Sequence, residues 1–110
     1  MLAMKPVILS LLVVAAFAPA QSTRFTGTIT DSMCPAGDHS RMRMGSTNAE
    51  CTIACNDVHG APYVLYDGKA AYTLSDQKTP QKFAGKKVTV TGKLDAKTKT
   101  IQVTSITASD

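Results

Sequence analysis

Aromatic side chains are scarce in this sequence, which has no tryptophan, three phenylalanines and three tyrosines. Proteins that hold single-stranded nucleic acid stack its bases on aromatic rings. Strong basic charge is also missing: the net charge is +4, and it falls to +3 without residues 1–20, which contain Lys5 and no acid. We therefore expect no nucleic-acid partner. Six lysines are interpreted as a solvated face that protects strand edges: Lys82, Lys86, Lys87, Lys93, Lys97 and Lys99.

Recognisable catalytic motifs are absent as well. The sequence has no glycine-rich phosphate loop, no H-E-x-x-H motif, no paired carboxylates and no C-x-x-C. Ser32, Asp38 and His39 are the residue types of a catalytic triad, but their spacing does not predict triad geometry. We therefore expect a protein that is not an enzyme.

Long apolar runs are missing too. The longest, Val7 to Phe17, covers 11 residues and is interrupted only by Ser10. It is too short for a hydrocarbon core of about 30 Å, so a membrane anchor is disfavoured. Lys5 precedes this run and Ala18-Pro19-Ala20 follows it, an order typical of a secretory signal peptide over residues 1–20. We expect cleavage between Ala20 and Gln21, a periplasmic or extracellular location, and no stable membrane insertion of the mature chain.

The rest of the chain shows no repeat, low-complexity tract or linker, so residues 21–110 are predicted to form one domain. Thr47 and Glu50 match a capping box that starts a helix, and Gly60 is typical of a helix end. Asp67-Gly68 predicts a hairpin turn. The expected elements, in order, are a strand at 24–30, a loop at 31–46, a helix at 47–59, strands at 63–66 and 70–74, a short helical turn within 75–85, and strands at 87–94 and 100–107.

This pattern predicts a mainly β fold with one helix. Five short strands favour a small five-stranded OB-like barrel, with the loop and helix inserted between the first and second strands. A small open sandwich is the alternative. Alternation predicts inward-facing Val88, Val90, Leu94, Ile101 and Val103, with a bulge near Ser105 and Gly27 at a bend or bulge. On the helix, the expected buried face contains Cys51, Ala54, Cys55 and Val58.

The cysteine count is odd, with Cys34, Cys51 and Cys55 all in the predicted mature chain. An oxidising compartment favours a disulfide. Cys34 would then pair with Cys51 or Cys55, and the third cysteine would be a small buried apolar group. A bridge between Cys51 and Cys55 is disfavoured, because residues i and i+4 of a helix have Cβ atoms about 5–6 Å apart and a disulfide needs less.

A metal site is the alternative to the disulfide. Cys34, His39, Cys51 and Cys55 form a Cys₃His set, which is a known zinc combination. Methionines Met33, Met42 and Met44 flank the same loop, and thioether, thiolate and imidazole together favour copper(I). Packed or exposed methionines are the preferred interpretation. His59 is interpreted as a last-turn residue rather than an outer ligand, and Asp31 as an Asx-turn residue or a hydrogen-bond partner of a ligand.

The quoted motifs resemble an uncharacterised family of small exported bacterial proteins, a domain of unknown function. The family pattern G-x-I-x-D-S-x-C corresponds to Gly27–Cys34, followed by His39, the C-x₃-C of Cys51 and Cys55, and V-T-V-x-G at residues 88–92. The resemblance implies an OB-like exported domain and assigns no activity. Residues Ser40 to Ser46 depart from the pattern as an insert between His39 and the helix.

Two functions remain open from the sequence. The leading one is a monomeric, non-enzymatic exported domain whose Cys/His site binds a transition metal, zinc or copper, or is stapled by a disulfide. The alternative is an interaction module that binds an envelope protein or a polyanion through the barrel face or the lysine-rich edge.

Overall fold

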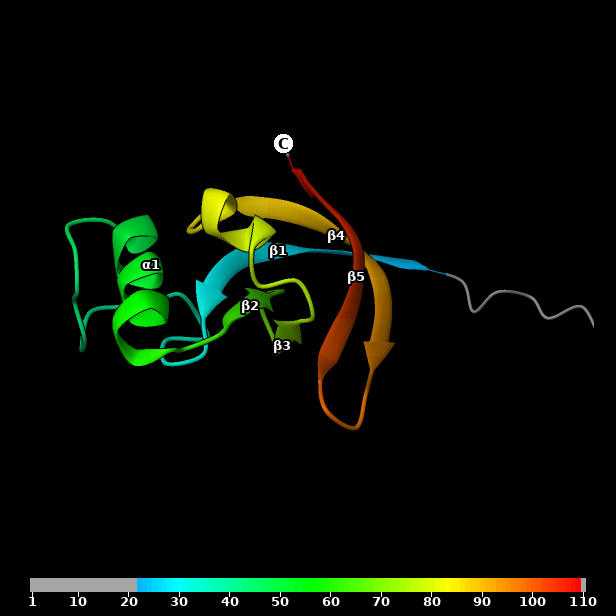
Figure 1. Ribbon diagram of the computed structural model, residues 1–110, viewed down its shortest axis with the longest axis horizontal. Helices are drawn as coiled ribbons and strands as arrows, with labels where there is room; N and C mark the ends of the chain where they lie inside the picture. Colours follow the sequence, from blue (N-terminus) through cyan, green and yellow to red (C-terminus); the bar gives the residue numbers. More distant parts are fainter. Residues whose placement is uncertain (1–21, 110) are drawn as a thin grey trace, which may run out of the picture.

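The computed structural model describes residues 22–109 (Figure 1). The predicted signal peptide, 1–20, and its cleavage site at Ala20 and Gln21 lie outside the described residues. Five strands, one α-helix and one 3₁₀ helix follow in the predicted order: β1 (Thr23–Asp31), α1 (Asn48–His59), β2 (Tyr63–Tyr66), β3 (Ala71–Leu74), η1 (Thr79–Phe83), β4 (Lys87–Asp95) and β5 (Thr100–Ala108). The mainly β class with one α-helix between the first two strands is thus confirmed.

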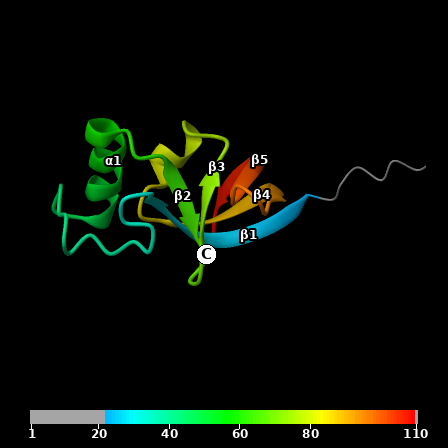
Figure 2. The same ribbon diagram turned by 90° about the horizontal axis from the view of Figure 1, so that it is seen from below.

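All five strands belong to one sheet. Their hydrogen-bonded order is β1-β2-β3-β5-β4, and the order returns to its start because β4 also pairs with β1. Every pairing is antiparallel except that of β3 with β5. Helix α1 and the loop before it lie at one end of this sheet, and the turn between β4 and β5 lies away from them (Figures 1 and 2).

Strand β1 joins two parts of the sheet. Its first residues pair with β4 and its last ones, from Thr28 to Asp31, pair with β2. Gly27 lies where the partner changes, and a Cβ there would collide with the backbone carbonyl of Tyr66. A glycine is needed for this close approach, and the strand carries on to deliver Asp31 to the end of the sheet that faces α1.

Apolar side chains fill the inside of the sheet. The predicted core residues Val88, Val90 and Ile101 are fully buried, and Val103 packs partly buried against them. Leu94 was expected with them and is 40% exposed. That prediction is wrong because β1 pairs with β4 only as far as Gly92, so the end of β4 that carries Leu94 pairs with β5 alone. The remaining core residues are Ile29, Tyr63, Leu65 and Leu74.

The predicted irregularity in the last strand is present. Thr91 pairs with Ser105, whereas the next residue, Gly92, pairs with Val103, so β5 has one extra residue at Thr104. Such a bulge shifts the alternation by one residue. This explains how Ile101, Val103 and Ile106 can all contact the core although Ile106 is out of phase in the sequence.

Helix α1 begins and ends as predicted. The Thr47 side chain accepts a hydrogen bond from the Glu50 N–H, and Gly60 has a left-handed φ of 66°. The buried face differs from the prediction, since Thr52 is fully buried beside Cys51 and Cys55 while Val58 is 67% exposed. The face is rotated toward Thr52 because the helix packs on β1 and its loop through its first turns. Within residues 22–109, no helix combines the length and apolarity needed to cross a membrane.

Candidate metal centre

The loop that leaves β1 is organised by Asp31, the last residue of that strand. One carboxylate oxygen, Oδ1, accepts hydrogen bonds from the N–H groups of Met33 and Cys34, each at 3.0 Å. This is an Asx turn, in which a side chain replaces a backbone acceptor. The Thr30 hydroxyl donates to the carbonyl of Cys34 at 2.8 Å. The short D-S-x-C spacing therefore holds the Cys34 side chain beside the Asp31 carboxylate.

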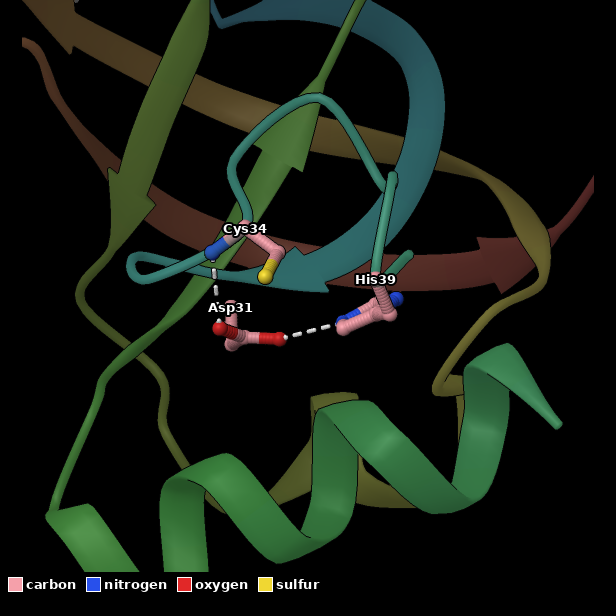
Figure 3. A group of neighbouring side chains, drawn as sticks. All are labelled: Asp31, Cys34 and His39. Carbon is pink, nitrogen blue, oxygen red and sulfur yellow. Dashed lines mark hydrogen bonds and ion pairs between the residues drawn. The ribbon is translucent and has the colours of Figure 1, made fainter. Parts of the chain in front are cut away.

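A second turn brings His39 back to the same point. The N–H of Gly37 donates to the Cys34 carbonyl at 2.8 Å, and Pro35 is the second residue of this turn, where proline is favoured. Gly37 has a φ of 76°, which favours glycine. His39 follows with 2% of its surface exposed, and its Nε2 lies 2.8 Å from Oδ2 of Asp31. Figure 3 shows the carboxylate between Cys34 and His39, on the side of the loop that faces α1.

These three residues offer a set of metal ligands. A carboxylate oxygen of Asp31, the Sγ of Cys34 and a ring nitrogen of His39 all lie within 4.8 Å of one another. Asp31 and His39 are buried, and Cys34 is partly buried. Carboxylate, thiolate and imidazole are the three ligand types that zinc uses in proteins. Asp31, Cys34 and His39 are positioned to bind a metal ion, and three protein ligands leave a coordination position for a further one.

The other ring nitrogen of His39 faces a small cavity. Nδ1 is buried and has no hydrogen-bond partner among residues 22–109, and the same holds for the Thr52 hydroxyl of α1. Both residues line a cavity of about 30 Å³ between β1 and α1. That volume is enough for one water molecule, which needs about 10–15 Å³. A bridging water there would fix the histidine ring with Nε2 directed at Asp31.

The two helical cysteines lie close to this group but outside the set of three. Both are fully buried on α1. The Cys51 thiol donates to the carbonyl of Gly45 at 3.3 Å, and the Cys55 Sγ lies 3.8 Å from the Met44 Sδ. The structure therefore brings Cys34 and His39 together with Asp31 and places Cys51 and Cys55 on the neighbouring helix.

The surroundings of Cys34 and Cys55 raise the pKa of both thiols and so disfavour the thiolate form. Burial, the nearby Asp31 carboxylate, Cys34 and Cys51 together raise the pKa of Cys55 to about 11. Burial, Asp31, Asp38 and Cys51 also raise the pKa of Cys34. Within residues 22–109, His39 is the only basic side chain within 4.0 Å of an acidic one. A bound cation would supply positive charge beside the carboxylate and the thiols, and it would favour their ionised forms.

The disulfide alternative is not what the structure contains. All three cysteines lie within residues 22–109, and each is a free thiol. The reason is local: the Asx turn holds Cys34 beside Asp31, whereas the thiols of Cys51 and Cys55 are directed at Gly45 and Met44. The predicted bridge from Cys34 to Cys51 or Cys55 is therefore replaced by three separate thiols.

Sequence reasoning found Cys34 and His39 and underestimated their neighbours. Asp31 was expected to form an Asx turn or to hold a ligand; its Oδ1 forms the Asx turn, and its Oδ2 is hydrogen-bonded to His39. Thr52 was missed because a search for an apolar helix face passes over a polar residue. The insert at 40–46 does not keep His39 from the helix, since His39 and Thr52 line one cavity. His59 is exposed in the last turn of α1, as predicted.

Comparisons with known proteins returned no relatives. No protein-family model matches the chain, and neither the curated proteins nor the solved structures include a match. The resemblance to a family of exported proteins thus stays a hypothesis from the sequence motifs, and the functional argument depends on the site itself.

Proposed function

We propose that this chain is an exported, non-enzymatic domain of OB-like architecture that binds a transition metal ion, zinc or copper, between the loop after β1 and helix α1. Export is inferred from Lys5, the apolar run of residues 7–17 and Ala18-Pro19-Ala20. The observation that carries metal binding is the convergence of Asp31, Cys34 and His39 within 4.8 Å.

The strand order supports the OB-like assignment. An OB fold is a five-stranded Greek-key barrel whose ligands bind at loops that include the one between the first two strands. Here β4 returns to pair with β1, β3 runs parallel to β5, and η1 lies between β3 and β4. The candidate metal residues come from the segment between β1 and β2, so their place in the fold agrees with a binding role.

The chemistry of the cluster supports a metal over a purely structural arrangement. A buried Asp–His pair alone would need no thiol beside it, yet Cys34 is fixed there by two hydrogen bonds through its own backbone. Exported thiols also meet an oxidising compartment. Coordination to a metal would keep Cys34 reduced, because a coordinated thiolate is not free to attack another sulfur.

Metal content of the purified protein tests this proposal. The full chain is expressed, purified anaerobically without chelator, and measured for zinc and copper by inductively coupled plasma mass spectrometry. We expect stoichiometric metal together with three titratable thiols after denaturation in chelator. Because bound metal stabilises only the folded state, chelator should lower the thermal midpoint of the wild type.

Two histidines provide a matched control. His39→Ala removes the buried imidazole and should abolish stoichiometric binding, whereas His59→Ala removes an exposed imidazole from the end of α1 and should leave binding intact. Cys34→Ser should behave like His39→Ala. Wild-type protein that takes up neither zinc nor copper under these conditions would overturn the proposal.

A further inference from the structure

We propose that Met44 is a thioether ligand of this metal site and makes it selective for copper(I) over zinc. The inference rests on the proposed metal site and goes further by naming the class of metal. It depends on one methionine that differs from its neighbours in burial and contact.

Met44 is the methionine whose sulfur contacts a cysteine of α1. Its Sδ lies 3.8 Å from the Cys55 Sγ, and its side chain is partly buried. Met33 and Met42 from the same loop are 41% and 40% exposed. The preferred interpretation from the sequence, packed or exposed methionines, therefore describes Met33 and Met42 well and leaves the sulfur contact of Met44 to be explained.

The chain around Met44 is fixed rather than loose. The next residue, Gly45, accepts the hydrogen bond of the Cys51 thiol at 3.3 Å. A Cβ on Gly45 would come 2.5 Å from the Cβ of Glu50, so the backbone lies directly against the first turn of α1. The Glu50 carboxylate accepts from both the N–H and the hydroxyl of Ser46, at 2.8 and 2.6 Å. These contacts hold the Met44 thioether over the Cys55 thiol before any metal arrives.

The distance between the two sulfurs suits a shared metal. Two sulfurs bound to one tetrahedral ion, each about 2.3 Å from it, lie about 3.8 Å apart. The Met44–Cys55 separation already has this value. Cys55 in turn lies three residues after Thr52 on α1, and Thr52 lines the same cavity as His39. A metal between the loop and α1 could therefore bind Met44 and Cys55 together with Cys34 and His39.

Ligand softness sets the preference. A thioether is a soft, uncharged donor that copper(I) binds well, whereas structural zinc sites use thiolate, imidazole and carboxylate. Each thiol that binds releases its proton to solvent, and copper stays in the +1 state throughout. Without Met44, the remaining thiolate, imidazole and carboxylate ligands suit zinc. Met44 is thus the residue that would shift the preference of the site from zinc toward copper(I).

Competition between the protein and chromogenic chelators tests this assignment. Copper(I) affinity is measured anaerobically against bicinchoninate, and zinc affinity against a zinc-responsive dye. Met44→Leu keeps the volume and removes the sulfur, and Met42→Leu makes the same change at an exposed position two residues away. We expect Met44→Leu to weaken copper(I) binding about tenfold or more, at least the loss typical of groups that only orient a ligand. Zinc affinity should stay unchanged, and Met42→Leu should change neither.

Each other outcome has a definite meaning. Equal copper(I) affinity in Met44→Leu and wild type, or an equal loss for both metals, would overturn the role of Met44 and leave the metal site standing. A wild type that binds zinc but not copper(I) would do the same. A wild type that binds neither metal would overturn both proposals. Selenomethionine-labelled protein gives a measurement without substitution: the selenium absorption edge should show copper as a neighbour, and its absence would exclude Met44 as a ligand.

Discussion

Two strand ends in this molecule use the same turn, yet they differ in what the turn holds. Asp31 is the last residue of β1 and Asp67 directly follows β2, and the Oδ1 of each accepts hydrogen bonds from the N–H groups two and three residues further on. Asp67 is exposed, and its carboxylate accepts hydrogen bonds from Lys69 and Ala70 within the hairpin turn. Asp31 is fully buried, and its second oxygen binds His39. The local turn is the same in both places, and burial with a histidine partner distinguishes the turn at the candidate metal centre.

The difference extends to the regions around the two turns. Among the described residues, the buried polar or charged side chains are Thr30, Asp31, His39 and Thr52, and all lie where β1 and its loop meet α1. The inside of the sheet is apolar. Burying a polar group costs free energy unless it gains a partner. The buried polar groups are thus concentrated at the candidate metal centre, whereas the core within the sheet has apolar side chains.

Substituting the two turn aspartates one at a time should give the largest difference in stability between the two regions. Asp31→Ala deletes the carboxylate that accepts from the Met33 and Cys34 N–H groups, and it leaves buried His39 without its partner. We therefore expect a loss of about 3–5 kcal/mol in the free energy of unfolding. Asp67→Ala deletes only an exposed acceptor and should cost much less. Urea denaturation of both variants measures the contrast, and equal losses would contradict the special role of Asp31.

A matched pair of leucines tests the apolar region. Leu65 is fully buried in the core, whereas Leu94 is 40% exposed at the end of β4. Leu65→Ala should lower the free energy of unfolding by about 2–5 kcal/mol through lost burial and a cavity. Leu94→Ala should cost much less. A large loss for Leu94→Ala, again by urea denaturation, would mean that β4 is covered further than Gly92.

The cavity beside His39 gives a smaller effect. Thr52→Val keeps the shape of the side chain and removes its hydroxyl, which should cost about 1 kcal/mol if a water bridges it to His39 Nδ1. Thr52→Ser retains the hydroxyl and should keep the histidine tautomer, read from the ¹⁵N chemical shifts of its ring. Thr52→Val with unchanged stability and unchanged shifts would show that no water links the two groups.

The smallest expected effect concerns pH at the β2–β3 hairpin. Hydrogen bonds from the N–H groups of Ala70 and Lys69 hold the pKa of Asp67 below its ordinary value of 3.8. The ionised form is thus favoured in the folded state, so its contribution is present above pH 3.8 and is lost as the pH falls below that value. Asp67→Asn should flatten this part of the pH–stability curve. An unchanged curve would mean that these hydrogen bonds are equally strong in the unfolded chain.

The elements were predictable because their signals are local. Thr47 and Gly60 mark the ends of α1, and alternation with a late phase change predicted the bulge in β5. The exposure of Val58 and Leu94 depends instead on which strand or loop lies opposite, which spacing does not encode. Cys34 and His39 could be selected from the sequence because their side chains are common metal ligands. The surroundings of Thr52 and Met44 depend instead on how the loop packs on α1, which residue type does not predict.

Anomalous X-ray diffraction from metal-loaded crystals tests the central claim most directly. Data are collected on either side of the absorption edge of the bound metal, so the difference map locates that element alone. The account predicts one strong peak between the loop and α1, within bonding distance of the Cys34 Sγ and a ring nitrogen of His39. A peak elsewhere, such as at the exposed His59, or no peak beside Asp31, Cys34 and His39 in loaded crystals, would contradict it.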